Sequence, residues 1–318
     1  MRDIQGKNVL VTGGAGFIGS HLVDALLQRG AGTVVALDNM FLGRESNLAE
    51  ACQRGAILYK DDAEFFGSVQ AVVKAHRIDT VFNLATKALN YSFINPANAF
   101  TTNVTVLANL LELQRAGEIE TVCHFSSSEV YGTAVYEPMD ERHPIHPTTT
   151  YAGGKAAADL LLHTYVNMFG VDAFIVRPFN NYGPRQNWTG PLAGIIPASA
   201  RRILAGERPV ICGTGEQKRD FIFVRDTVSA ALDLYALLDK GAEVNVAADE
   251  SVSMNELMRH ICRLMAYTGE WERLPARGAD VLCHHASNEY LRSLIAFTPT
   301  PLAAGLTETL NWYREVLA

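Results

Sequence analysis

The 318-residue sequence predicts an α/β fold: a doubly wound parallel sheet with a smaller, interleaved C-terminal domain. Three observations lead to this prediction. Short apolar, β-branched runs alternate with stretches of helical periodicity, a glycine-rich turn follows the first run, and the composition changes after Arg177. Strict alternation of strand and helix favours parallel strands joined by right-handed crossovers.

The elements of the first half follow from local pattern. Residues 8–12 (NVLVT) have the apolar character of a strand that is buried on both faces. Similar runs predict further strands at 33–37, 57–59, 80–84, 121–126 and 173–176. Apolar residues at helical spacing predict helices at 17–29, 69–76, 97–116 and 152–169.

The second half has a different character. Residues 178–220 contain five prolines and many glycines, so we expect them to be rich in loops. Residues 221–224 (FIFV) and 244–247 are expected to be strands at the edge of the main sheet, and 251–318 to be mainly helical. The predicted division is therefore 1–177 with roughly 221–250 as one domain, and 178–220 with 251–318 as the other.

Composition excludes several classes of protein. With 48% hydrophobic residues the chain can form a core, and a net charge of −7 without a basic run argues against nucleic-acid binding. No signal peptide or membrane-spanning stretch is expected. The odd count of five scattered cysteines predicts free thiols in the cytoplasm. His260, Cys262 and residues 283–285 do not have the spacing of a metal site, so no metal is predicted.

The glycine-rich turn predicts a dinucleotide site. Gly13, Gly16 and Gly19 permit a tight turn, close approach of the backbone to a pyrophosphate, and close packing of the next helix. That helix directs its N-terminal N–H groups at the phosphates. Asp38 ends the next strand, where a carboxylate binds the adenosine ribose and repels a 2′-phosphate; this favours NAD over NADP, although Arg44 lies nearby. Asp61 and Asp62 are candidate adenine contacts, with a solvated strand end as the alternative.

A second set of residues predicts catalysis. Tyr151 and Lys155 form a YxxxK at the start of a predicted helix, where residues four apart share a face. A nearby ammonium is expected to lower the pKa of the phenol and make it a base toward a sugar hydroxyl. Hydroxyls at 126–128 end a strand and face the same crevice, where they can bind the oxygen that is oxidised.

Taken together, these motifs resemble those of the extended short-chain dehydrogenases/reductases, in the branch of nucleotide-sugar epimerases, dehydratases and decarboxylases. The motifs are TGGAGFIG (12–19), Asp38-Asn39, Asn83-Leu84-Ala85, Asn103, SSSEVYG (126–132), YAGGK (151–155), RPFNNYGPRQ (177–186) and Arg219-Asp220-Phe221. The resemblance implies a Rossmann domain that binds NAD and a second domain that binds a UDP-sugar. It also implies a homodimer formed through the helices at 97–116 and 152–169.

The resemblance assigns roles residue by residue. Ser127, Tyr151 and Lys155 become the catalytic hydroxyl, base and lysine. Asn180, Arg219 and Arg277 become contacts of the substrate's diphosphate. Further cofactor contacts are implied at Ala15, Phe17, Ile18, Asn39, Leu84, Ala85, Asn103 and Phe179.

The branch includes several reactions that begin with oxidation at C4 of the hexose. Dehydration also needs a base for the C5 proton, and Glu129 occupies the position where dehydratases carry Glu. Ser128 stands where many 4,6-dehydratases have Asp, so the acid for the leaving C6 hydroxyl is open: Glu129 itself or Lys87 are candidates, and Lys87 can equally be a surface lysine. The chain most resembles a dehydratase, specifically the UDP-GlcNAc 5,6-dehydratases of the tunicamycin pathway.

Three alternatives stay open. A UDP-glucuronate decarboxylase would need a cation for the substrate carboxylate, and Arg185 is the candidate. A 4-epimerase needs no further base, and a non-catalytic NAD-binding sensor would need no tuned phenol. The sequence leaves open the nucleotide base, the C2 substituent of the sugar, and whether hydride returns to C4 or C6.

Overall fold

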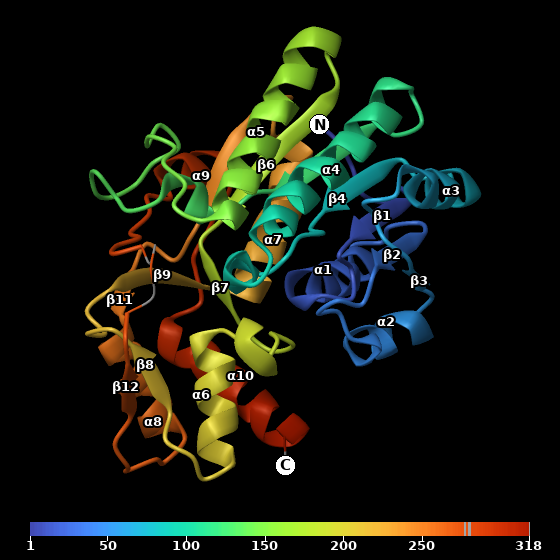
Figure 1. The fold of residues 1–318 in the computed structure, drawn as a ribbon. Helices are drawn as coiled ribbons and strands as arrows, with labels where there is room; N and C mark the ends of the chain where they lie inside the picture. Colours follow the sequence, from blue (N-terminus) through green and yellow to red (C-terminus); the bar gives the residue numbers. More distant parts are fainter. Residues whose placement is uncertain (277, 279–280, 318) are drawn as a thin grey trace.

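A parallel seven-stranded sheet forms the centre of the computed structural model, which describes residues 1–276, 278 and 281–317 (Figure 1). Its strands lie in the order β10-β6-β5-β4-β1-β2-β3. The chain order reverses beside β1, and the carboxyl ends of the strands open a crevice at such a point. The strands are β1 (Val9–Thr12), β2 (Val34–Asp38), β3 (Ile57–Lys60), β4 (Thr80–Asn83), β5 (Thr121–Phe125), β6 (Asp172–Pro178) and β10 (Glu243–Val246).

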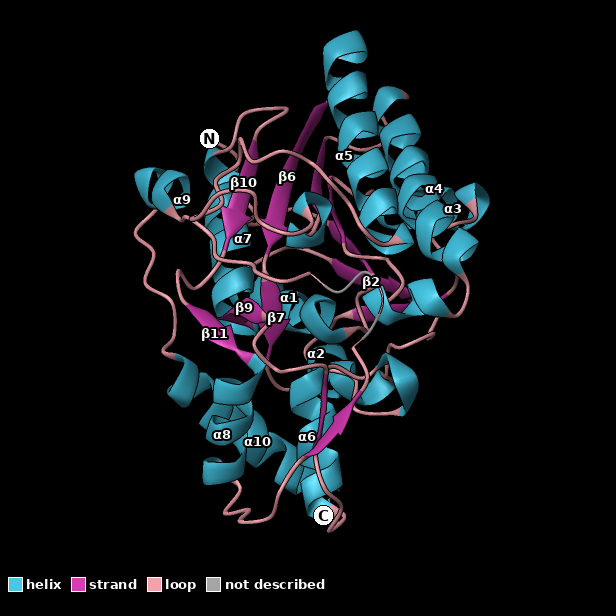
Figure 2. Ribbon diagram, turned by 60° about the vertical axis from the view of Figure 1, so that its left-hand side comes forward, coloured by secondary structure: helices cyan, strands magenta, loops and turns pink. Residues whose placement is uncertain are grey.

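Helices cover both faces of this sheet, as expected for a doubly wound fold (Figure 2). One apolar core is shared by the sheet with α1 (Phe17–Gln28), α2 (Ala49–Gln53), α7 (Val224–Leu237) and α9 (Glu289–Leu294). The opposite core is shared with α3 (Phe66–His76), α4 (Pro96–Arg115) and α5 (Thr150–Phe169). Short 3₁₀ turns follow several strands or precede helices: η1 (Glu45–Leu48), η2 (Leu89–Phe93), η3 (Ser128–Tyr131) and η4 (Gly190–Leu192).

Local sequence fixes where α5 begins and ends. The side chain of Thr149 accepts a hydrogen bond from the backbone N–H of Ala152 and caps the helix. Gly170, with φ +69°, ends it in the left-handed conformation that glycine adopts without strain. The cap places Tyr151 in the first turn, at the edge of the crevice.

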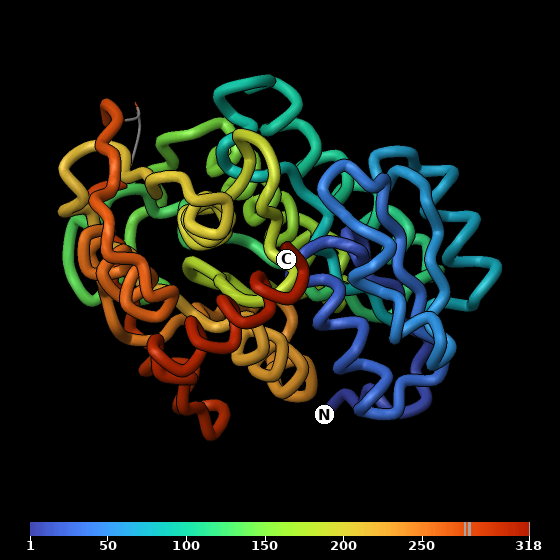
Figure 3. Tube along the Cα trace, turned by 90° about the horizontal axis from the view of Figure 1, so that it is seen from below, coloured from blue at the N-terminus to red at the C-terminus, as the bar shows by residue number. Residues whose placement is uncertain are grey.

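The remaining elements form a smaller assembly at the carboxyl end of the sheet (Figures 1 and 3). A three-stranded sheet has the order β11-β9-β7, and a two-stranded sheet pairs β12 with β8. An apolar core joins these strands to α6, α8 and α10. The bounds are β7 (Asn180–Tyr182), α6 (Ile195–Leu204), β8 (Val210–Cys212), β9 (Lys218–Phe223), β11 (Ser251–Ser253), α8 (Met254–Leu264), β12 (Glu272–Leu274) and α10 (Leu302–Leu317).

The structure confirms the doubly wound sheet and corrects parts of the second half. The strand expected at 244–247 is β10 at the edge of the main sheet, as predicted. The strand expected at 221–224 belongs to β9 of the three-stranded sheet, because it pairs with β7 and β11 instead. Residues 178–220 hold the helix α6, and 251–276 include two short strands beside α8. Within the described residues, no helix combines the length and apolar character needed to cross a membrane.

Candidate active site

A cavity of about 650 Å³ lies at the carboxyl ends of the main-sheet strands. Residues that follow β1, β2, β4, β5 and β6 line one side of it, and residues of the smaller assembly such as Arg219 and Phe221 line the other. The predicted site residues within the described part of the chain all line this cavity, except Ala15 and Asn103. Arg277 lies outside the described residues.

The glycine turn is packed too closely for any side chain. A Cβ atom added at Gly19 would lie 2.2 Å from the carbonyl oxygen of Gly13, and one at Gly13, where φ is +69°, would lie 3.0 Å from backbone atoms of Leu84 and Ala85. The N-terminus of α1 receives no side-chain cap from Gly16. The first residues of this helix, Phe17 to Gly19, line the cavity, so a pyrophosphate bound there would meet the N-terminus of α1.

Asp38 lines the cavity, and backbone hydrogen bonds fix the position of its carboxylate. Its Oδ2 accepts a hydrogen bond from the N–H of Ala15 at 3.0 Å, and its Oδ1 accepts one from Met40 at 2.8 Å. Burial raises the pKa of Asp38. Arg44 stacks on the ring of Trp188, 3.8 Å from its centroid, so this guanidinium is engaged elsewhere and does not offset the charge of Asp38. The residues present therefore fit NAD.

Two predicted cofactor contacts, Ala15 and Asn103, do not line the cavity but hold residues that do. Ala15 is buried and uses its N–H on Asp38. The amide of Asn103 accepts a hydrogen bond from Thr86 at 2.7 Å and donates one to the carbonyl of Ala99. Asn103 thus fixes the loop after β4. Asn39 lines the cavity and donates to Asp62 at 2.9 Å.

Ser127, Tyr151 and Lys155 meet on one side of the cavity. The phenol of Tyr151 is hydrogen-bonded to the Ser127 hydroxyl, and the ammonium of Lys155 donates to the carbonyl oxygen of Phe125 at 2.7 Å. The expectation of a lowered phenol pKa is wrong for this structure, because burial raises the pKa of Tyr151 to about 12. Burial lowers the pKa of Lys155 to about 8, and the charge of Asp159 opposes that shift.

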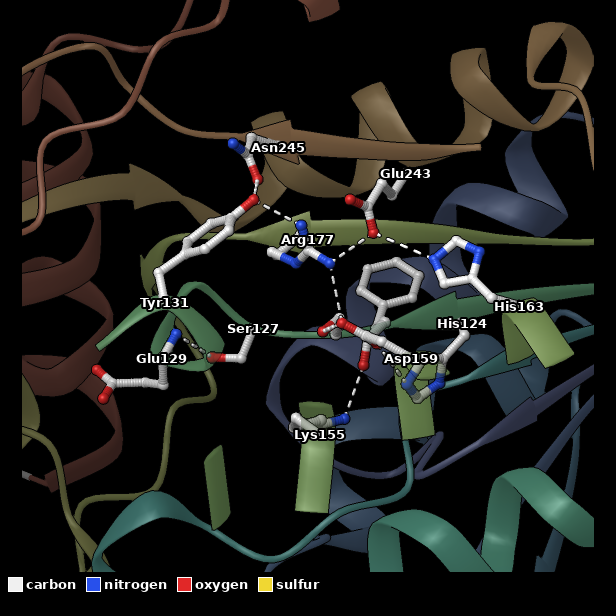
Figure 4. A network of polar contacts seen from close by, with 12 residues as sticks. His124, Ser127, Glu129, Tyr131, Lys155, Asp159, His163, Arg177, Glu243 and Asn245 are labelled. Atoms are coloured by element: carbon white, nitrogen blue, oxygen red, sulfur yellow. Dashed lines mark hydrogen bonds and ion pairs between the residues drawn. The ribbon is translucent and has the colours of Figure 1, made fainter. Parts of the chain in front are cut away.

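Glu129 adds an acidic residue to the same cavity. Glu129 lies in the turn η3, and its backbone N–H donates to the Ser127 hydroxyl at 3.3 Å. The residue is only 8% exposed. Its negative charge raises the pKa of Tyr151, and both residues line the cavity. In Figure 4 the backbone nitrogen of Glu129 lies beside the Ser127 hydroxyl, and the Glu129 carboxylate extends away from Ser127 and Lys155.

Ser128 has a partner that the sequence did not indicate. Its hydroxyl lies 3.4 Å from Nδ1 of His284, whose Nε2 lies 2.9 Å from the carbonyl oxygen of Gly132. Burial lowers the pKa of His284 to about 3, so the ring is neutral, donates from Nε2 to Gly132 and accepts from Ser128 at Nδ1. Residue spacing gives no sign of this contact, because the two residues are 156 positions apart.

The structure revises the expectations for two cations. Lys87 is 7% exposed and not a surface lysine: its Nζ lies 4.6 Å from the ring centroid of Phe41 and 3.9 Å from the Glu64 carboxylate. These partners belong to the loops after β2 and β3, beside the expected adenosine site. Arg185 directs its Nη1 at Asp24 of α1, 2.7 Å away, so its guanidinium is not free for a substrate carboxylate.

Two further residues that the sequence predicts as contacts of a diphosphate, Asn180 and Arg219, line the cavity. Asn180 lines the cavity and its Nδ2 is buried with no hydrogen-bond partner, so it can donate to an anionic oxygen. Arg219 lies at the cavity wall, 9% exposed, and donates to the carbonyl of Lys218 at 2.9 Å. No group of three or more potential metal ligands occurs within the described residues.

A family model matches most of the chain. Residues 9–247 match the family described as "NAD dependent epimerase/dehydratase family". The chain is 34% identical to a UDP-glucose 4-epimerase of Mycolicibacterium smegmatis over 96% of this chain and 98% of that one. A dTDP-glucose 4,6-dehydratase of the same organism is 30% identical, with 96% and 93% covered.

Solved structures give the same picture. The UDP-glucose 4-epimerase of Thermotoga maritima, solved with UDP-glucose, matches with a TM-score of 0.92 at 30% identity, covering 98% of this chain and all of that one. A UDP-N-acetylglucosamine 4-epimerase of Methanobrevibacter ruminantium matches at 0.89 and 32%, with 99% and 100% covered. A dTDP-glucose 4,6-dehydratase of Streptomyces venezuelae, solved with NAD, matches at 0.91 and 26%, with 97% of both covered.

Proposed function

Because the chain belongs to the NAD-dependent epimerase/dehydratase family, we propose that it is a nucleotide-sugar dehydratase that acts on a UDP-hexose. Its cofactor is NAD, which when bound accepts the hydride from C4 of the sugar and later returns it. The proposal depends most on one observation: Glu129, a buried acidic residue, lines the same cavity as Tyr151 and acts electrostatically on its phenol.

The proposed reaction has two proton-transfer steps, one at the C4 hydroxyl and one at C5, and different residues carry them out. Tyr151, hydrogen-bonded to Ser127, takes the proton of the C4 hydroxyl as that carbon is oxidised. The resulting ketone acidifies the adjacent C5–H, and Glu129 takes that proton. Epimerisation needs only rotation of the keto sugar, and a β-keto acid loses carbon dioxide without deprotonation at C5. Elimination therefore explains a carboxylate here better than either alternative.

The protonated Glu129 can also supply the acid that the leaving hydroxyl needs. Ser128 donates its proton to neutral His284, and a hydroxyl so engaged is a poor acid. Lys87 contacts Phe41 and Glu64 on the cofactor side. A single carboxyl that takes the C5 proton and passes it to the departing C6 oxygen closes the proton balance.

We further propose UDP-GlcNAc as substrate. Loss of water would give either a 5,6-unsaturated sugar or a 4-keto-6-deoxy sugar, of the kind used in antibiotic biosynthesis. The similar UDP-N-acetylglucosamine 4-epimerase structure supports the N-acetyl group. A cytoplasmic location is supported by the free state of all five cysteines. A homodimer is supported by exposed apolar side chains on α4 and α5, among them Phe100, Leu160 and Met168.

A UDP-sugar 4-epimerase is the second candidate, favoured by the 34% identity to the mycobacterial enzyme. A decarboxylase is less well supported, because Arg185 is paired with Asp24. The presence of Ser127, Tyr151 and Lys155 together in the cavity argues against a sensor without turnover.

The variant Glu129→Gln tests the proposal. With UDP-GlcNAc in deuterated water, we expect it to keep forming reduced cofactor while product formation and deuterium uptake at C5 fall at least about 100-fold. Glu141→Gln is the matched control, because Glu141 accepts a backbone hydrogen bond from Asn245 and does not line the cavity. Turnover by Glu129→Gln at the wild-type rate would overturn the dehydratase mechanism.

A further inference from the structure

A line of polar side chains crosses the middle of the main sheet. Thr12 of β1 donates to Asn83 of β4 at 2.7 Å, and Asn83 donates to Nδ1 of His124 on β5 at 3.0 Å. These residues are direct neighbours in the strand register. Strands buried on both faces are usually apolar, so a polar line through them is unusual.

Asp159 of α5 continues this line to the other edge of the sheet (Figure 4). Its Oδ1 lies 3.7 Å from Nε2 of His124, and its Oδ2 accepts from Arg177 of β6 at 2.9 Å. The same Arg177 nitrogen donates to Glu243 of β10 at 2.8 Å. We call Thr12, Asn83, His124, Asp159, Arg177 and Glu243 the polar ladder.

The position of Asp159 on α5 connects the ladder to the cavity. Tyr151, Lys155, Asp159 and His163 are four residues apart and therefore share one face of the helix. His163 approaches Glu243 at 3.4 Å and closes the far end. The carboxylate thus lies one turn behind Lys155, whose ammonium is directed at the Phe125 carbonyl.

Stability alone does not account for this arrangement. Arg177 is fully buried and Asp159 is 1% exposed, yet Nε of the arginine and Oδ1 of the aspartate lack a hydrogen-bond partner. Buried polar networks that are incompletely satisfied cost free energy relative to apolar packing.

We propose that Asp159 is a positioning residue for the oxidation step: it holds Lys155 toward the cavity as an ammonium, and the polar ladder fixes Asp159. This inference rests on the proposed function only through the shared step at Tyr151 and Lys155.

The sign of the expected effect follows from the charges around Lys155. Asp159 acts on Lys155 from α5, and Lys155 in turn acts on His124 of β5. Arg177 of β6 acts on Asp159, and Glu129 of η3 acts on Tyr151. Asp159 raises the pKa of both Tyr151 and Lys155. Removing its charge lowers both, so both limbs of the pH–rate profile move to lower pH.

The first measurement does not depend on turnover. Lysine is labelled with ¹³C, and the Lys155 signal, assigned with Lys155→Met, is titrated by NMR in the protein with and without NAD. In Asp159→Asn we expect its midpoint to fall by about one pH unit. Tyr131→Phe is the control, because it removes a hydrogen bond to Arg177 without changing charge and should leave the midpoint unchanged. Asp159→Ser replaces the asparagine variant if that variant does not fold.

The second measurement is the pH profile of reduced-cofactor formation with UDP-GlcNAc. An optimum shifted to lower pH in Asp159→Asn supports the proposal. An unchanged Lys155 midpoint, or a slower rate with an unchanged profile, would assign Asp159 a purely structural role. If the wild-type protein oxidises no nucleotide sugar, the proposed function fails while the NMR titration still decides the role of Asp159.

Discussion

Replacing Gly19 by alanine should separate α1 from the phosphate turn. The new Cβ would lie 2.2 Å from the carbonyl oxygen of Gly13 and 3.0 Å from Cα of Gly14. Since carbon and oxygen normally approach to about 3.3 Å, turn and helix must move apart by about 1 Å. Such overpacking costs about 1–3 kcal/mol of unfolding free energy. The same movement withdraws the N–H groups from the pyrophosphate, and we expect Kd for NAD to rise about 10- to 100-fold, or about 1.4–2.8 kcal/mol.

The chain offers a matched control in Gly67. This glycine also lies in the first turn of a helix, α3, but a Cβ there meets nothing within 4 Å. Gly67→Ala should leave Kd for NAD unchanged and raise the unfolding free energy by about 0.5–1 kcal/mol. Titration calorimetry of cofactor-depleted protein and urea unfolding measure the two quantities. A Gly19→Ala variant that binds NAD within twofold of the wild type would refute the reasoning.

Three further predictions concern specificity, assembly and pH. Asp38→Asn should narrow the preference for NAD over NADP by about tenfold or more, measured as the ratio of the two Kd values, because it removes the charge that repels a 2′-phosphate. Leu160→Glu should give monomers in sedimentation velocity while Leu237→Glu leaves the dimer intact; the two leucines are 63% and 40% exposed, but only Leu160 lies on the proposed dimer helices. Burial raises the pKa of Asp220 to about 7, so its contribution to stability is full below about pH 4 and lost as pH rises to about 7. Urea unfolding of Asp220→Asn should therefore show a larger gain over wild type at pH 8 than at pH 5, and an equal difference at both would contradict the assignment.

The parts predicted correctly from the sequence are those encoded by local pattern. The glycine turn, the strand that follows it with Asp38 and the YxxxK helix each depend on residues within a few positions of one another, so their spacing specifies their geometry. The inner strands of the main sheet were recognisable because parallel strands buried on both faces are continuously apolar, whereas the edge strand β3 is only partly buried.

The parts that the sequence did not reveal depend on contacts between distant residues. The side chain of Arg185 is committed to Asp24, 161 positions away, and Ser128 meets His284 across 156 positions. The strand at 218–223 pairs with β7 and β11 because the smaller assembly forms its own sheets, which apolar patterning does not distinguish from an edge of the main sheet. The high pKa of Tyr151 reflects desolvation of its phenol in the fold, a property that a YxxxK spacing does not contain.

The most direct test of the central claim is mass spectrometry of the products formed from a panel of UDP-sugars in deuterated water. The account predicts loss of one water from UDP-GlcNAc. A 4-keto-6-deoxy product would carry a solvent deuteron at C5, whereas a 5,6-unsaturated product would carry no hydrogen at C5. A proton NMR spectrum then distinguishes a methyl group from an exocyclic methylene. Unchanged product mass, as an epimerase would give, or loss of carbon dioxide from UDP-glucuronate alone, would contradict a role for Glu129 as the C5 base.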